Sequence, residues 1–179
     1  MSIKIRIHKD IRQTVDFVRQ VQSAGVSFLT VHGRTLQERT KVPVHLDEIA
    51  TVLFYFVIEN VDIPVLANGD IREPNDIFAC IDATNAQGVM SARGILSNPA
   101  LFAGYTHPPK QCVQGYFDQA LQFGGHFKIH HHHLMFLLST HYLTKSEKKD
   151  FNSRKSMCSL LDFLKDRQIY TLNTHTNTV

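Results

Sequence analysis

Residues 26–35 read Val-Ser-Phe-Leu-Thr-Val-His-Gly-Arg-Thr, an apolar stretch that runs directly into a polar turn containing a glycine. Two later stretches follow the same plan, residues 63–70 (Ile-Pro-Val-Leu-Ala-Asn-Gly-Asp) and residues 87–94 (Gln-Gly-Val-Met-Ser-Ala-Arg-Gly). Short apolar runs bounded by turn residues are typical of buried strands. Three such runs in series predict neighbouring strands of one sheet.

Helical patterns separate these runs. Residues 3–7 alternate isoleucine with charged residues as a strand does, and helical patterns follow at 11–24, 47–60 and 74–83, the last with Pro74 at its first position. In 11–24 the predicted apolar stripe consists of Ile11, Val15, Phe17, Val18 and Val21. Alternating strands and helices predict an α/β fold with a parallel sheet covered on both faces.

The pattern changes after Pro99. Residues 110–124, 126–143 and 154–168 are helical patterns without a strand between them, and the charged stretch 145–150 is expected to be a linker. We therefore expect a βα domain over residues 1–105, a small helical domain over 106–170 and a disordered tail over 171–179.

The three polar turns favour phosphate binding. Side chains beyond the carboxyl ends of parallel strands surround the ligand in such folds. Gly33, Gly69 and Gly94 would let backbone N–H groups approach an anion, while His32 and Arg93 would donate to its oxygens. The alternative is that these glycines only turn the chain.

Lys4 has two interpretations. It alternates with Ile3 and Ile5, so its side chain lies on the opposite face of the strand. It is either a solvated charge on an edge strand or an interior lysine that faces an electron-rich ligand ring.

Composition sets broad limits. The chain has 179 residues, 43% of them hydrophobic, and a net charge of +3, which permits an anionic partner without requiring one. Cys80, Cys112 and Cys158 are widely spaced, and the chain opens on a strand pattern, so we expect reduced thiols in a cytoplasmic protein. No apolar stretch reaches the length of a membrane span.

Four successive histidines, 130–133, raise the question of a metal site. Only His130 and His133 share a helical face, and no cysteine or carboxylate stands at a matching spacing. We expect no metal, and instead partly buried packing with contact to an anionic surface.

The turns and their flanks resemble the tRNA-dihydrouridine synthases. The matching stretches, in family order and spacing, are residues 2–7, 25–35 with Glu38-Arg39, 63–71, and 88–96 with 98–102. Residues 102–105 and 133–135 are similar to the eukaryotic branch called tRNA-dihydrouridine synthase 4-like. The resemblance covers residues 2–170.

This resemblance implies an FMN-binding TIM-type (β/α)8 barrel followed by a helical domain that binds tRNA. Members reduce the C5–C6 double bond of uridine in tRNA with FMN that NADPH has reduced. Lys4 would contact the flavin ring. The FMN ribityl chain and phosphate would be held by His32, Asn68, Gly69, Asp70, Ala92 and Arg93.

The chain also departs from the family pattern. It has four of eight expected strands, and none of its cysteines stands at the place of the family's catalytic cysteine, the acid that protonates uridine C5. We therefore expect the C-terminal half of the barrel, inactive by itself. The alternatives are a non-catalytic truncated form with residual RNA binding, or a βα phosphate-binding protein with another substrate.

Overall fold

The computed structural model describes residues 1–58 and 63–172, and its first part is built on a four-stranded parallel sheet. The strands, in spatial order, are β1 (Ser2–Arg6), β2 (Phe28–His32), β3 (Val65–Asn68) and β4 (Gly88–Met90). They are connected by α1 (Ile11–Ser23), α2 (Leu46–Ile58) and α3 (Pro74–Thr84). The predicted α/β class and the parallel sheet are confirmed.

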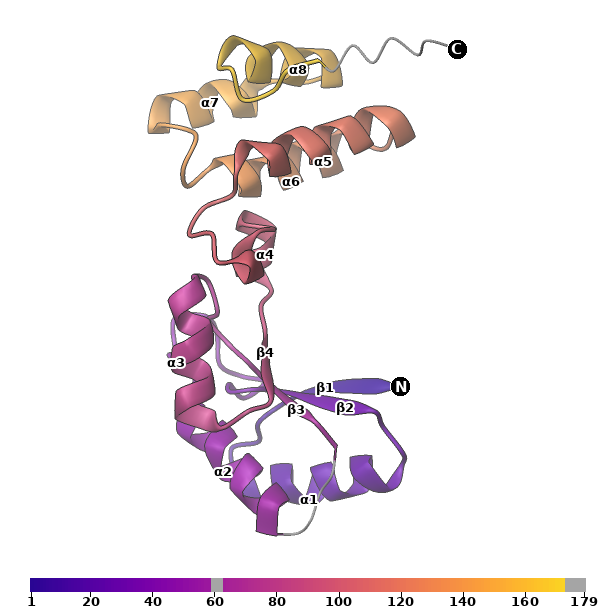
Figure 1. Ribbon diagram of the computed structural model, residues 1–179, viewed down its shortest axis with the longest axis vertical. Coiled ribbons are helices and arrows are strands. Elements are labelled where there is room, and N and C mark those ends of the chain that lie inside the picture. Colours follow the sequence, from indigo (N-terminus) through magenta and orange to yellow (C-terminus); the bar gives the residue numbers. More distant parts are fainter. Residues whose placement is uncertain (59–62, 173–179) are drawn as a thin grey trace. The chain divides into compact units, whose positions relative to one another are not determined.

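The two faces of the sheet differ in chemistry. Leu29, Val31, Val65 and Ala67 are fully buried on one face, and α1, α2 and α3 lie along one side of the sheet (Figure 1). The other face carries polar residues in register: Arg6 pairs with His32, and His32 pairs with Asn68. Within the described residues of this unit, helices cover one face only, which corrects the expectation of cover on both.

Helix α1 shows why these residues form this element. The Asp10 carboxylate caps its first turn by accepting from the Arg12 N–H, and Gly25, with φ +74°, follows its end. Its buried stripe is Thr14, Val15, Val18 and Val21. Phe17 was predicted in this stripe, but it is 40% exposed. Two positions after Val15 a helix has turned about 200°, which puts Phe17 on the far side.

Helix α3 begins as predicted, with Pro74 in its first turn. The Asp76 carboxylate accepts from the backbone N–H groups of Arg72 and Glu73. This capping box fixes the segment that leaves the turn after β3, and it therefore helps to position the residues of that turn.

Contacts divide the chain into two compact units, Met1–Gly94 and Ile95–Val179, so the division falls inside α4 (Arg93–Ser97). The second unit contains the 3-10 helix η1 (Leu101–Ala103), α5 (Lys110–Phe123), α6 (Phe127–Leu138), α7 (Lys145–Ser153) and α8 (Met157–Asp166). Its core is a cluster of buried side chains that includes Val113, Phe117, Leu134, Phe151 and Phe163. The proposed domain boundary near residue 106 stays a prediction, since compactness alone does not define a functional domain.

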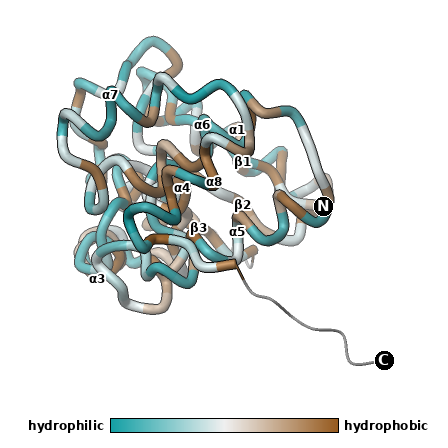
Figure 2. Tube along the Cα trace, turned by 90° about the horizontal axis from the view of Figure 1, so that it is seen from above, coloured by the Kyte–Doolittle hydropathy of each residue, from teal (hydrophilic) through white to brown (hydrophobic). Residues whose placement is uncertain are grey.

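Two predictions about the helical segments were wrong. The charged stretch 145–150 belongs to helix α7, which is hydrophilic in sequence (Figure 2) and starts at a capping box formed by Thr144 and Glu147. It is held by Phe151, which is completely buried. The helix predicted over 126–143 ends at Leu138.

The end of the described chain packs on α5. The Thr171 N–H donates to the Gln114 side-chain oxygen at 2.9 Å, and the Gln114 amide donates back to the Thr171 carbonyl at 2.7 Å. Most of the predicted disordered tail, residues 173–179, lies outside the described residues. Among the helices that the structure describes, none has the length and apolarity needed to cross a bilayer.

Candidate functional site

A cavity of about 230 Å³ lies where the four strands end. Its walls are Lys4, Arg6, His32, Asn68, Gly69, Asp70, Ile71, Arg72, Ala92 and Arg93. All seven residues predicted to bind a cofactor are among them. They come together because adjacent parallel strands end at the same edge of the sheet.

Asp70 is the electrostatic centre of this cavity. It accepts from both terminal nitrogens of Arg34, one of them at 3.1 Å, and from Arg93 at 2.8 Å. Burial raises the pKa of the Asp70 carboxyl, but the hydrogen bond and charge of Arg34 and the charges of Arg93 and Arg72 hold that pKa below its ordinary value. Asp70 is therefore ionised, and its backbone adopts a left-handed φ of 54°.

Arg34 acts from inside the protein. Its side chain is 2% exposed, and its Nε donates to the Val42 carbonyl at 2.6 Å. The Arg34 guanidinium thus joins the loop after β2 to the turn after β3. Asp70 in turn accepts a hydrogen bond from Arg93.

His32 places beside this cavity a buried ring nitrogen without a partner among the described residues. Its Nδ1 is buried and makes no hydrogen bond to any residue that the structure describes. Burial, and then the charges of Lys4, Arg6 and Arg34, lower the pKa of His32 to about 4. Its ring is therefore neutral at pH 7, and His32 enters the cavity wall as an uncharged imidazole.

Lys4 lines the same cavity from β1. Burial, followed by the charge of Arg6, lowers the pKa of its ammonium group. Lys4 is exposed on the edge strand β1 and also lines the cavity, so both interpretations of Lys4 stay predictions.

Asn68 has a structural as well as a lining role. Its amide Nδ2 donates to the Met90 carbonyl at 2.7 Å and so joins β3 to β4. Asn68 is 5% exposed, so this hydrogen bond between the strands is buried.

The glycines act differently from the prediction. The Gly33 N–H donates to the Asn68 carbonyl, so it is not offered to an anion. A Cβ on Gly33 would lie 2.7 Å from the Val44 side chain, and one on Gly94 would lie 2.5 Å from the Ile71 carbonyl. These two positions need glycine for close packing, and only Gly69 of the three lines the cavity.

Sequence reasoning missed three arginines of this site. Arg6 stands two residues after Lys4, so strand periodicity placed it on the same face. Arg34 lies within the first polar turn, and Arg72 stands two residues after Asp70. The sequence shows that these arginines stand near the predicted turns. It does not show that Arg34 pairs with Asp70, because the two residues are 36 positions apart.

A second cavity of about 530 Å³ adjoins the first and shares Arg6, His32 and Arg93 with it. Its other walls come from the loop after β2 and are Arg34, Leu36, Glu38, Arg39 and Thr40.

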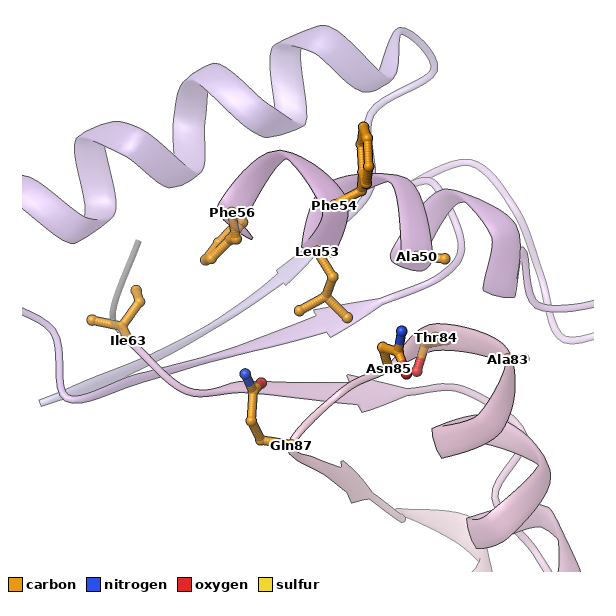
Figure 3. Close-up of a pocket in the computed structure, with 9 residues that line it drawn as sticks. All are labelled: Ala50, Leu53, Phe54, Phe56, Ile63, Ala83, Thr84, Asn85 and Gln87. Atoms are coloured by element: carbon orange, nitrogen blue, oxygen red, sulfur yellow. The ribbon is translucent and has the colours of Figure 1, made fainter. Parts of the chain in front are cut away.

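A third cavity, of about 470 Å³, lies between α2 and α3 (Figure 3). Leu53, Phe54 and Phe56 of α2 line it, with Ile63 and Gln87 ahead of β3 and β4. It is therefore at the amino ends of these strands, and among the described residues none of its lining side chains is charged. The described lining of this third cavity has no charged side chain like those at the carboxyl ends of the strands.

The cysteines and the histidine run lie outside the two charged cavities. Cys80 is 2% exposed in α3, and burial raises the pKa of its thiol. His130 bonds to the Tyr116 hydroxyl at 3.0 Å, and His133 stacks on the Tyr116 ring at 4.4 Å. In the part of the chain that the structure describes, no three His, Cys, Asp or Glu residues are grouped as a metal site.

Comparison with known proteins supports the resemblance. The sequence model described as dihydrouridine synthase (Dus) matches residues 1–177. The tRNA-dihydrouridine(20a/20b) synthase [NAD(P)+]-like protein of Mus musculus is 43% identical over 166 residues, which are 93% of this chain and 49% of that protein. The tRNA-dihydrouridine(20a/20b) synthase [NAD(P)+] of Saccharomyces cerevisiae is 42% identical over 167 residues, 91% of this chain and 44% of that protein.

A bacterial relative, tRNA-dihydrouridine synthase B of Proteus vulgaris, is 28% identical over 183 residues, 92% of this chain and 55% of that protein. The chain spans about half the length of the curated relatives it matches. Because the family model covers nearly the whole sequence, the chain belongs to the dihydrouridine synthase family.

Proposed function

We propose that this chain contributes the phosphate side of an FMN site in a tRNA-dihydrouridine synthase. Its four βα units would be half of a TIM-type (β/α)8 barrel, and residues 106–170 would form a helical tRNA-binding domain. The observation that carries the proposal is that all seven predicted residues line one cavity at the carboxyl ends of four adjacent strands.

The residues of the cavity are suited to FMN. Arg6, Arg72 and Arg93 outnumber the one carboxylate of the described lining, Asp70, and so favour a phosphate dianion. The neutral ring of His32, which lines the cavity, suits an uncharged hydroxyl, as in a ribityl chain. Lys4 would stabilise negative charge on the ring.

The chemistry that FMN supplies when bound is hydride transfer, here to uridine in tRNA, with NADPH as the reductant. The protein residues would bind and orient it. Arg93 would contact the phosphate while Asp70 and the buried Arg34 keep its guanidinium in place.

We propose further that these 179 residues do not reduce uridine by themselves. The reaction needs an acid within hydrogen-bond reach of uridine C5. Among the described residues, neither charged cavity is lined by a cysteine. The second candidate function, residual RNA binding without catalysis, rests on this observation.

Flavin binding tests the first proposal. The purified chain is titrated into FMN and into riboflavin, and the quenching of flavin fluorescence is followed. We expect FMN to bind about tenfold or more tightly than riboflavin, because the phosphate meets the cationic wall. Arg93→Gln should remove most of this preference.

The matched control is Arg12→Gln, which removes an equal charge from an exposed site on α1. It should leave the preference for FMN unchanged. A folded chain that binds neither flavin, or that binds both equally, contradicts the proposal.

Catalysis is tested with NADPH, FMN and unmodified tRNA, and dihydrouridine is measured. We expect none from this chain alone. Robust turnover would refute the claim that a further acid is required.

A further inference from the structure

The excess positive charge of this chain is concentrated at the two adjoining cavities. Their walls carry six cationic side chains, Lys4, Arg6, Arg34, Arg39, Arg72 and Arg93, and two carboxylates, Glu38 and Asp70. The excess of four exceeds the net charge of +3 of the whole chain. One phosphate dianion in the first cavity would neutralise only half of it.

The cationic side chains of the second cavity differ in whether they already form hydrogen bonds within the protein. Arg34 and Arg93 are bonded to Asp70, and Arg6 donates to the Thr35 carbonyl at 2.8 Å. Arg39 is exposed, and its guanidinium makes no hydrogen bond or ion pair with any residue of the described ranges 1–58 and 63–172. Arg39 is therefore available to an external anion.

The loop that carries Arg39 is already held in one conformation. Arg34 bonds to the Val42 carbonyl within it. The His45 N–H donates to the Gly33 carbonyl at 2.7 Å, which closes the loop at its base. An anion bound at Arg39 would therefore cost little ordering of the backbone.

Among the described residues, Glu38 is the one carboxylate that lines the second cavity, and it is already bonded within the loop. Glu38 accepts from the Thr35 N–H at 2.7 Å with one oxygen, and its other oxygen lies 2.9 Å from Nε2 of His45. Glu38 is thus directed into the loop rather than toward an incoming anion.

We propose that the second cavity binds a phosphodiester of an RNA backbone, with Arg39 as its principal contact. This inference rests on the proposed function, and it assigns to the barrel side of the chain a backbone contact separate from the helical domain. Arg39, Thr40 and Lys41 are consecutive and exposed, and they are residue types that contact nucleic-acid phosphates. Leu36 beside them is 79% exposed and offers an apolar surface to a ribose.

A pyridine dinucleotide suits this cavity less well. Its pyrophosphate is usually held by a glycine-rich turn at the start of a helix, and residues 34–45 contain no glycine. A phosphodiester carries one charge, which the single unengaged guanidinium of Arg39 can match.

Fluorescence anisotropy tests the inference with the full 179-residue chain and a labelled, unmodified tRNA transcript, in 50–200 mM KCl. We expect Arg39→Gln to weaken binding by about three- to tenfold at 150 mM KCl and to lower the slope of log affinity against log salt by about one. Arg12→Gln is the control. It removes one exposed charge on α1, outside both cavities, and should change neither quantity.

Several results would overturn the inference. They are no tRNA binding by the wild-type chain, an equal effect of the two substitutions, or an effect of Arg39→Gln on NADPH binding in place of tRNA binding. The flavin titration is run on the same samples. Loss of FMN binding together with an Arg39 effect on tRNA would reject the proposed function alone, whereas intact FMN binding without that effect would reject only this inference.

Discussion

Arg34 and Asp70 form a two-armed ion pair in which both terminal nitrogens of a buried guanidinium meet both oxygens of one carboxylate. The Arg34 side chain is 2% exposed and that of Asp70 is 32% exposed. The pair joins two loops that follow neighbouring strands, and it therefore helps to hold the polar turns together in one site.

Removing the charge of Asp70 should destabilise the chain. Asp70→Asn leaves the buried Arg34 without its counter-ion, and we expect the free energy of unfolding to fall by about 2–3 kcal/mol. Urea unfolding followed by circular dichroism measures this. Asp16→Asn, which breaks an exposed pair with Arg19, should cost less than about 1 kcal/mol, and equal losses for the two substitutions would contradict the expected role of burial.

Two glycines should respond differently to alanine. In Gly33→Ala the new Cβ would meet both the Val44 side chain and the His45 carbonyl, whereas in Gly69→Ala the atoms it would meet all belong to Val44. Each substitution should cost about 1–3 kcal/mol by overpacking. Adding Val44→Ala should recover part of the loss for Gly69→Ala, although strain at its φ of +140° remains.

The same addition should not recover Gly33→Ala, because the backbone carbonyl stays in place. Unfolding of the four variants in urea compares these costs. Equal recovery at both positions would show that the His45 carbonyl can move.

The free energy of unfolding should decrease as the pH falls from 6.5 to about 4, the interval between the ordinary pKa of histidine and the pKa of His32 in the folded chain. Its pKa is lowered from 6.5 to about 4 in the folded chain, so between these values the unfolded state binds more protons. The neutral ring's contribution is present above pH 6.5 and is lost progressively toward pH 4. His32→Gln should flatten this part of the dependence of unfolding free energy on pH, and an unchanged slope would count against a buried neutral His32.

Tyr170 should stabilise the second unit through its hydroxyl group, which is hydrogen-bonded in a buried position. Its hydroxyl donates to Asp118 at 2.6 Å, and the ring is 4% exposed. Tyr170→Phe should lower the free energy of unfolding by about 1 kcal/mol. The matched control is Tyr105→Phe, whose ring is 53% exposed, and thermal unfolding should leave that variant near the wild type.

The strands and most helices could be predicted because their signals are local. The stripe Val15, Val18 and Val21 follows the helical repeat, and all three side chains are buried. The miss at α7 is also local in origin. A highly charged stretch suggested a linker, although Thr144 and Glu147 already carried the spacing of a capping box.

The sequence by itself determined the order of strands and helices, the family, and the polar turns that supply the site residues, because each depends on neighbours along the chain. Only the tertiary structure decided how those residues are used. It paired Arg34 with Asp70, set Val44 against Gly33 and Gly69, and left the Arg39 guanidinium exposed. Such contacts join distant positions and depend on loop packing, for which the sequence carries no periodic signal.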